Sequence, residues 1–102
     1  GFDDVRELDI PFGRDSYELT DKGRATLDRL ASYLEVDQSI RHVILSGYAA
    51  KAGNRIYNQE LVQLRLDQVQ EYLLDRGVPG ELLVALQRQG KGSRRIRIRL
   101  QR

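Results

Sequence analysis

Several residue types that often carry chemistry are absent from this chain or nearly so. There is no cysteine, no methionine and no tryptophan, and His42 is the only histidine. Without cysteine the chain forms neither a disulfide nor a thiolate zinc site, and one histidine argues against a zinc site of any common type. No Ser-His-acid set and no paired carboxylates in a predicted loop are found. We therefore expect no catalytic residue, no metal, no cofactor and no enzymatic activity.

Long apolar runs and an excess of one charge are also missing. No run approaches the ~20 residues that a membrane-spanning helix needs. The 17 lysines and arginines are nearly balanced by 15 acidic residues, and both signs are spread along the chain. Nucleic-acid surfaces usually need a basic stripe with aromatic platforms. We expect no membrane span in this chain and no nucleic-acid partner.

A length of 102 residues fits one domain with one core. Because the chain starts with Gly1 rather than methionine, we expect residues 1–102 to be a single domain excised from a larger protein. Residues 1–6 are predicted to be a lead-in without regular structure.

Apolar periodicity predicts four strands, over residues 7–12, 40–46, 82–87 and 94–100. Pro11 indicates that the first strand lies at a sheet edge or ends there, because proline cannot donate a ladder hydrogen bond. Gly47 is expected to end the second strand. In the last strand three arginines alternate with apolar residues, and we expect them to pair with Glu7 and Asp9 if the first and last strands are neighbours.

Two helices are predicted between these strands. Thr20 is a good N-cap for the first helix, whose apolar stripe is Leu27, Leu30, Ala31 and Leu34. The second helix runs from about residue 55 to 76, with the stripe Val62, Leu66, Val69 and Leu73. Gly77 and Pro79 form a strong stop signal. The predicted fold is α+β, a βαβαββ two-layer sandwich with both helices on one face of a four-stranded mixed sheet.

The densest group of ligand-binding side chains lies where the second strand passes through a loop into the second helix. It comprises Asn54, Arg55, Asn58, Glu60 and Arg65. Asn58, Leu61 and Arg65 fall at i, i+3 and i+7, roughly on one helix face, so an amide and a guanidinium can converge there. The alternative is that these are ordinary solvated helix residues.

The chain resembles the OmpA-like C-terminal domain family, which includes peptidoglycan-associated lipoproteins and the wall-anchoring domains of flagellar proteins such as MotB and MotY. Residues 10–34, IPFGRDSYELTDKGRATLDRLASYL, are similar to the first strand and helix of the family. The central signature of the family begins with a Gly-His-Thr-Asp turn, which corresponds to Gly47 to Ala50. It continues with a Gly and an Asn, which correspond to Gly53 and Asn58, and with a Leu-Ser-x-x-Arg-Ala helix start, which corresponds to Leu61 to Leu66. The stretch from Ser93 to Ile96 resembles the family's Asn-Arg-Arg-Val, and the turn before it, residues 90–93, is short for the family.

The resemblance implies a site for the diaminopimelate of the peptidoglycan stem peptide. Arg65 is implied to bind its carboxylate, because a bidentate Arg–carboxylate pair is strong and directional, with Asn58 in support. The acid that receives the ammonium group corresponds to Ala50, and its neighbours correspond to Tyr48 and Ala49. Ala50 cannot form the ion pair with the ammonium group. Losing one charged partner in a partly buried site typically costs about 2–5 kcal/mol of binding free energy, enough to turn a micromolar site into a millimolar one. The candidate ligand-binding residues are Arg65, Asn58, Tyr48, Ala50 and Asn54.

Two functions remain open at this point. One is a non-catalytic periplasmic module of a Gram-negative cell envelope, attached to an outer- or inner-membrane protein, whose binding to peptidoglycan is weak or lost. The other is a protein-interaction or structural module of an envelope or flagellar assembly, with other envelope proteins as partners. Asn58 and Arg65 favour the first function, and the changes from Tyr48 to Ala50 favour the second. By the family resemblance we expect the last strand to lie between the first two.

Overall fold

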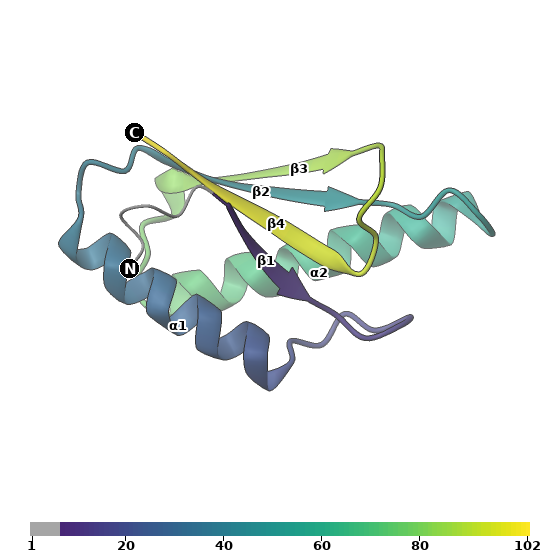
Figure 1. Cartoon of the computed structure of the whole chain (residues 1–102), viewed down its shortest axis with the longest axis horizontal. Helices are drawn as coiled ribbons and strands as arrows, with labels where there is room; N and C mark the ends of the chain where they lie inside the picture. Colours follow the sequence, from purple (N-terminus) through teal and green to yellow (C-terminus); the bar gives the residue numbers. More distant parts are fainter. Residues whose placement is uncertain (1–6) are drawn as a thin grey trace.

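The computed structural model describes residues 7–102, so the lead-in predicted for residues 1–6 lies outside the described part (Figure 1). The elements are β1 (Glu7–Pro11), α1 (Asp21–Val36), β2 (His42–Tyr48), α2 (Arg55–Asp75), a short 3-10 turn η2 (Gly80–Leu82), β3 (Leu83–Arg88) and β4 (Arg95–Gln101). The predicted order βαβαββ is confirmed.

The four strands form one mixed sheet in the order β1-β4-β2-β3. β4 runs antiparallel to both β1 and β2, and β3 runs parallel to β2. The expected place of the last strand between the first two is therefore confirmed, as is the edge position of Pro11. Glu7 lies opposite Arg99 and Asp9 opposite Arg97. Arg97 forms ion pairs with Asp9 at 3.1 Å and with Glu7 at 3.2 Å.

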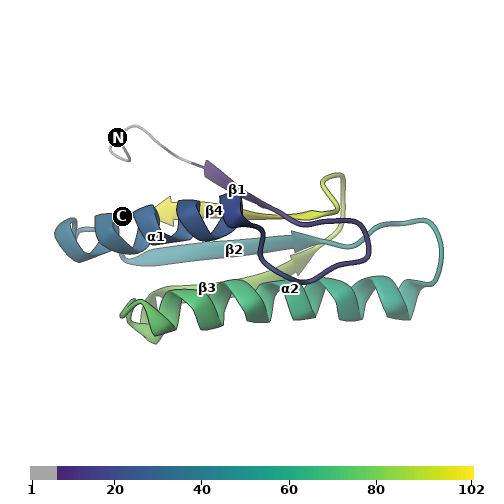
Figure 2. The ribbon, with the colours of Figure 1, turned by 90° about the horizontal axis from the view of Figure 1, so that it is seen from below.

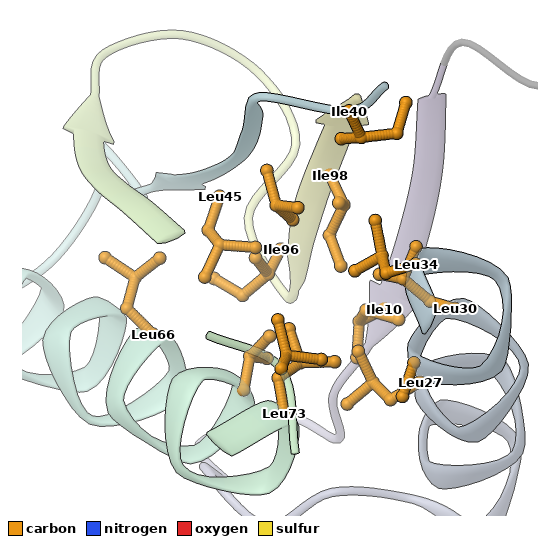
Figure 3. Packing of buried hydrophobic residues seen from close by; sticks show 14 of the residues in the cluster. Ile10, Leu27, Leu30, Leu34, Ile40, Leu45, Leu66, Leu73, Ile96 and Ile98 are labelled. Atoms are coloured by element: carbon orange, nitrogen blue, oxygen red, sulfur yellow. The ribbon is translucent and has the colours of Figure 1, made fainter. Parts of the chain in front are cut away.

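Both helices pack against the same face of the sheet (Figures 1 and 2). Alternate residues of the strands point into the layer between sheet and helices, where the predicted stripes of both helices meet them (Figure 3). The fully buried members are Ile10, Leu27, Leu30, Val43, Leu45, Leu66, Val69, Leu73, Ile96 and Ile98. The helix stripes predicted from the sequence are thus confirmed, and within residues 7–102 no helix covers the second face of the sheet (Figure 2).

The ends of both helices follow the capping chemistry of the sequence. The Thr20 hydroxyl accepts a hydrogen bond from the Gly23 N–H at 3.0 Å, and the Asn54 side-chain oxygen accepts one from the Tyr57 N–H at 2.9 Å. α2 ends at Asp75, and Gly77 takes the left-handed conformation, with φ of 90°, in which glycine is unstrained.

Gly47 does not end the second strand, which corrects the prediction from the sequence. β2 continues through Gly47 to Tyr48, and Gly47 is itself paired with Ile96 and Gln87. A Cβ atom at position 47 would lie 2.5 Å from Val62 Cγ1 of α2. Glycine is needed at this position because α2 passes so close to the sheet, and the backbone remains in the strand.

Candidate functional site

The candidate site lies at one end of the sheet, where four segments meet. Because β1 and β2 both run antiparallel to β4, their last residues lie beside the first residues of β4, at the same end of the sheet. The β1–α1 turn, the β2–α2 loop, the first turns of α2 and the turn before β4 therefore gather there. They enclose a pocket of about 390 Å³ lined by Arg14, Asp15, Tyr48, Ala50, Ala52, Asn58, Leu61, Val62, Arg65, Ser93 and Arg94.

Arg65 forms the floor of this pocket and is only 3% exposed. Its Nε donates a hydrogen bond to the Ser16 carbonyl at 2.7 Å, and its Nη2 donates to the Gly13 carbonyl at 3.0 Å. The guanidinium also lies over the Phe12 ring, 5.3 Å from the centroid. For Arg65 the alternative of a solvated surface residue is therefore wrong. These hydrogen bonds use two of the five N–H groups of the guanidinium, and the little surface that Arg65 exposes lines the pocket.

The charge on Arg65 is set by burial and by its neighbours. Burial lowers the pKa of Arg65, and the positive charge of Arg94 acts in the same direction. Tyr57 and Asp15 oppose this effect and favour the charged form. An arginine side chain stays protonated in proteins, so a cation is present at the bottom of the pocket.

Asn58 fixes the loop that forms one wall of the pocket. Its side-chain amide donates to the Ala50 carbonyl at 2.9 Å and to the Ala52 carbonyl at 2.8 Å. Both amide hydrogens are used in this way, so the carbonyl oxygen of the side chain is the group left for a ligand. Ala50 is exposed and lines the rim of the pocket.

The structure brings four of the five predicted site residues together: Tyr48, Ala50, Asn58 and Arg65 line one pocket. Asn54 is not among the residues that line it, and its side-chain oxygen is occupied as the N-cap of α2. Arg55 lines a neighbouring hollow of about 450 Å³ on the other side of the loop, together with Lys51 and Arg88. The ligand-binding roles of the five residues remain predictions.

Four further residues line this pocket that were not predicted from the sequence, namely Arg14, Asp15, Ser93 and Arg94. The first two stand in the β1–α1 turn and the last two in the turn before β4. Strand order was the signal that could have found them, because it fixes which turns share one end of the sheet. With these residues included, three guanidinium groups face one carboxylate, that of Asp15, among the described residues that line the pocket.

Comparison with known proteins identifies the family. A family model for the OmpA family matches residues 11–98. The chain belongs to the OmpA family. Outer membrane protein A of Escherichia fergusonii is 33% identical over 78 residues, which are 76% of this chain and 32% of that protein. Outer membrane protein A of Shimwellia blattae is 33% identical over 85 residues, 82% of this chain and 34% of its relative. The chain thus spans about a third or less of the length of the curated relatives it matches.

Solved structures show the same OmpA-like fold. The peptidoglycan-associated lipoprotein from Burkholderia pseudomallei superposes with a TM-score of 0.80, at 25% identity, and 98% of each chain is covered. The OmpA-like domain of FopA1 from Francisella tularensis gives 0.76 at 24% identity, covering 93% of this chain and 73% of that one. The periplasmic domain of Helicobacter pylori MotB gives 0.72 at 16% identity, with coverages of 92% and 74%.

The two helices of this OmpA-family chain have 16 and 21 residues, and each buries one apolar stripe. Within residues 7–102 neither α1 nor α2 has the length and apolar character to cross a membrane. Both helices use their apolar stripes on the sheet instead.

Proposed function

We propose that this OmpA-family chain is a non-catalytic module of a larger periplasmic envelope protein, and that it contacts peptidoglycan through the Arg65 pocket. The observation that carries the proposal is the convergence of Arg65, Asn58 and Tyr48 on one solvent-accessible pocket, at the positions where the family resemblance expects the stem peptide. The relation to peptidoglycan-associated lipoprotein supports this assignment.

The pocket of this chain is expected to bind diaminopimelate weakly. Arg65 retains N–H groups that can hold a carboxylate, and a charge-assisted pair of this kind is directional. Ala50, however, offers no carboxylate at the rim for the ammonium group. The next residue, Lys51, is a cation and cannot replace the missing carboxylate. It lines the neighbouring hollow and not this pocket.

A non-catalytic role agrees with the placement of the titratable groups. His42 is exposed at the start of β2, at the opposite end of that strand from the pocket. Within the described residues, no three His, Asp or Glu side chains stand close enough together to hold a metal ion. The pocket itself offers binding groups, and we assign it to recognition.

The proposal is tested by co-sedimentation with purified peptidoglycan sacculi of the diaminopimelate type. The wild-type domain is expected to sediment weakly, and Ala50→Asp should strengthen its binding roughly tenfold. This gain is smaller than the loss typical of a partly buried site, because position 50 is exposed and water screens the added charge. Ala25→Asp is the matched control, since it adds the same charge at an exposed position of α1. Arg65→Ala is a poor control because Arg65 also holds the backbone of the β1–α1 turn.

Two results would contradict parts of this proposal. Tight binding by the wild-type domain would show that the site is not weakened. If folded wild-type protein and Ala50→Asp both stay in the supernatant, the domain is an interaction or structural module instead. For that second function the sheet face that no helix covers within residues 7–102 is available (Figure 2), and it presents charged side chains such as Arg88, Arg97 and Arg99.

A further inference from the structure

A second hollow, the sheet-face hollow, lies on the side of the sheet that no helix covers within residues 7–102 (Figure 2). It has a volume of about 190 Å³, and Ser46 of β2 forms its floor. Three arginines of β3 and β4 stand around it, namely Arg88, Arg97 and Arg99. Among the described residues, only Tyr48 lines both this hollow and the Arg65 pocket. The two sites are therefore separate.

The acidic residues of β1 neutralise only part of the positive charge beside the sheet-face hollow. Arg97 forms ion pairs with Glu7 and Asp9, and Asp9 also pairs with Arg95 at 3.3 Å. Arg99 lies opposite Glu7 in the ladder, but the Glu7 carboxylate turns to Arg97 instead. Within residues 7–102 the exposed Arg99 side chain has no ion pair. Cross-strand pairing thus accounts for Arg95 and Arg97 but not for Arg99.

Arg88 reaches the hollow from β3 and is held over its floor. Its Nε donates a hydrogen bond to the Ser46 hydroxyl at 3.1 Å, and it has no acidic partner in the described part of the chain. Ser46 is only 7% exposed, although no helix packs on its side of the sheet. A hydroxyl can donate one hydrogen bond as well as accept, and no acceptor for the Ser46 hydrogen is found among residues 7–102. The floor therefore offers a donor, and a buried donor needs an acceptor.

We propose that the sheet-face hollow binds the phosphate group of a phosphate monoester. Three guanidinium groups and the carboxylate of Glu7 line it, which leaves two net positive charges. The neighbouring ion pair of Arg95 with Asp9 adds one charge of each sign and does not change this balance. A phosphate monoester carries a charge of about −1.5 to −2 at pH 7, together with oxygens that accept from guanidinium and hydroxyl groups. A single carboxylate would compensate only half of the charge.

An anionic membrane surface is the competing occupant of this face. Such a surface would also meet Glu7 and Asp9, whose side chains are 50% and 44% exposed beside the arginines and would be repelled. The donor of Ser46 lies below the arginines, where a flat array of lipid headgroups does not reach it as well as one small group does. The charges and the shape therefore favour a small, bounded anion.

The experiment is an NMR titration of the intact domain that follows the backbone amides of β2, β3 and β4. The probes are glycerol 3-phosphate, a monoester, and dimethyl phosphate, a diester with a single negative charge. Wild-type protein should bind the monoester more tightly than the diester, with saturable shifts around Ser46. Arg99→Gln should weaken the monoester roughly tenfold, because one charge-assisted hydrogen bond is lost. Arg41→Gln is the matched control: Arg41 is exposed and lies outside the hollow, so its removal should leave binding unchanged.

A substitution that should strengthen binding tests the charge balance. Glu7→Gln removes the carboxylate that competes for Arg97, so the monoester should bind roughly threefold more tightly, the effect of one screened charge at an exposed site. Glu71→Gln, an exposed position of α2 in the other layer, makes the same change in net charge and should have no effect.

Three outcomes would overturn the proposal. The first is the absence of shifts around Ser46 with glycerol 3-phosphate. The second is an equal loss of affinity in Arg99→Gln and Arg41→Gln, which would show diffuse attraction to net charge and no site. The third is wild-type protein that co-sediments with vesicles containing phosphatidylglycerol but does not bind glycerol 3-phosphate, which would assign this face to a membrane surface. None of these outcomes bears on the contact with peptidoglycan, because Arg99 and Glu7 lie outside the Arg65 pocket.

Discussion

The contact between Gly47 and α2 gives the most sharply defined prediction for stability. A methyl group at position 47 would lie 2.5 Å from Val62 Cγ1 and 3.2 Å from Ile96 Cδ1. Carbon atoms in cores pack at about 3.5–4.0 Å. Gly47→Ala therefore either moves α2 away from β2 by roughly 1 Å or forces the Val62 side chain out of its rotamer. Overpacking of this kind typically costs about 1–3 kcal/mol.

The free energy of unfolding is measured by urea denaturation, and the partner substitution identifies the clash. Val62→Ala alone should cost about 1.5–3 kcal/mol, since a buried valine is truncated. Because it also removes the atom that an alanine at 47 would strike, the double variant should be more stable than the two separate costs predict, by about 1 kcal/mol or more. Additive costs would show that α2 does not approach the sheet at Gly47.

A matched glycine provides the control. Gly13→Ala places its methyl group 3.7 Å from the nearest atom, which is ordinary contact, and Gly13 has no left-handed conformation to lose. It should leave stability unchanged or raise it by less than about 1 kcal/mol, because alanine lowers the entropy of the unfolded chain. A loss at Gly13 as large as that at Gly47 would refute the steric explanation.

Two further predictions concern the core and the acid range. Leu66→Ala should lower the free energy of unfolding in urea by about 2–5 kcal/mol, because Leu66 is buried. Gln63→Ala should leave it nearly unchanged, because Gln63 is exposed. An unchanged urea midpoint in Leu66→Ala would contradict this orientation of α2. Hydrogen bonds from Ser39 and Tyr33 hold the pKa of Asp37 well below its usual range. The ionised Asp37 carboxylate therefore stabilises the fold fully above about pH 4, and this contribution is lost as the pH falls toward the folded-state pKa. Asp37→Asn should lower Tm at pH 7, and the gap to wild type should narrow in thermal scans below about pH 3; a gap independent of pH would contradict the assignment.

The sequence was sufficient for the elements and the helix faces. Apolar spacing identified the stripes from Leu27 to Leu34 and from Val62 to Leu73, because each period reports which side of a helix is buried. Thr20 and Gly77 marked helix ends because capping depends on local chemistry. The order of the strands came from the family resemblance, since periodicity contains no information on which strands are neighbours.

The parts that the sequence did not reveal depend on contacts between distant segments. Gly47 was expected to end a strand, because the distance between a helix and a sheet is invisible in a one-dimensional pattern. The hydrogen bonds of Arg65 to Gly13 and Ser16 join segments about fifty residues apart. For the same reason Asp15 was not recognised as a pocket residue, since its turn is polar and without a motif of its own.

The central position of β4 has a consequence for how the domain reaches its native state. β1 and β2 each pair with β4 and not with each other. The four strands therefore form one sheet only after β4, the last strand in the chain, has paired with both of them. The pairing of Glu7 with Arg99 encloses nearly the whole described chain in one loop. Closing such a loop is entropically costly and slows folding. It also favours cooperative folding, because an intermediate without β4 has neither a continuous sheet nor the turn with Ser93 and Arg94 that lines the Arg65 pocket. A chain that emerges from its amino end would thus complete the Arg65 pocket only in the last step of folding.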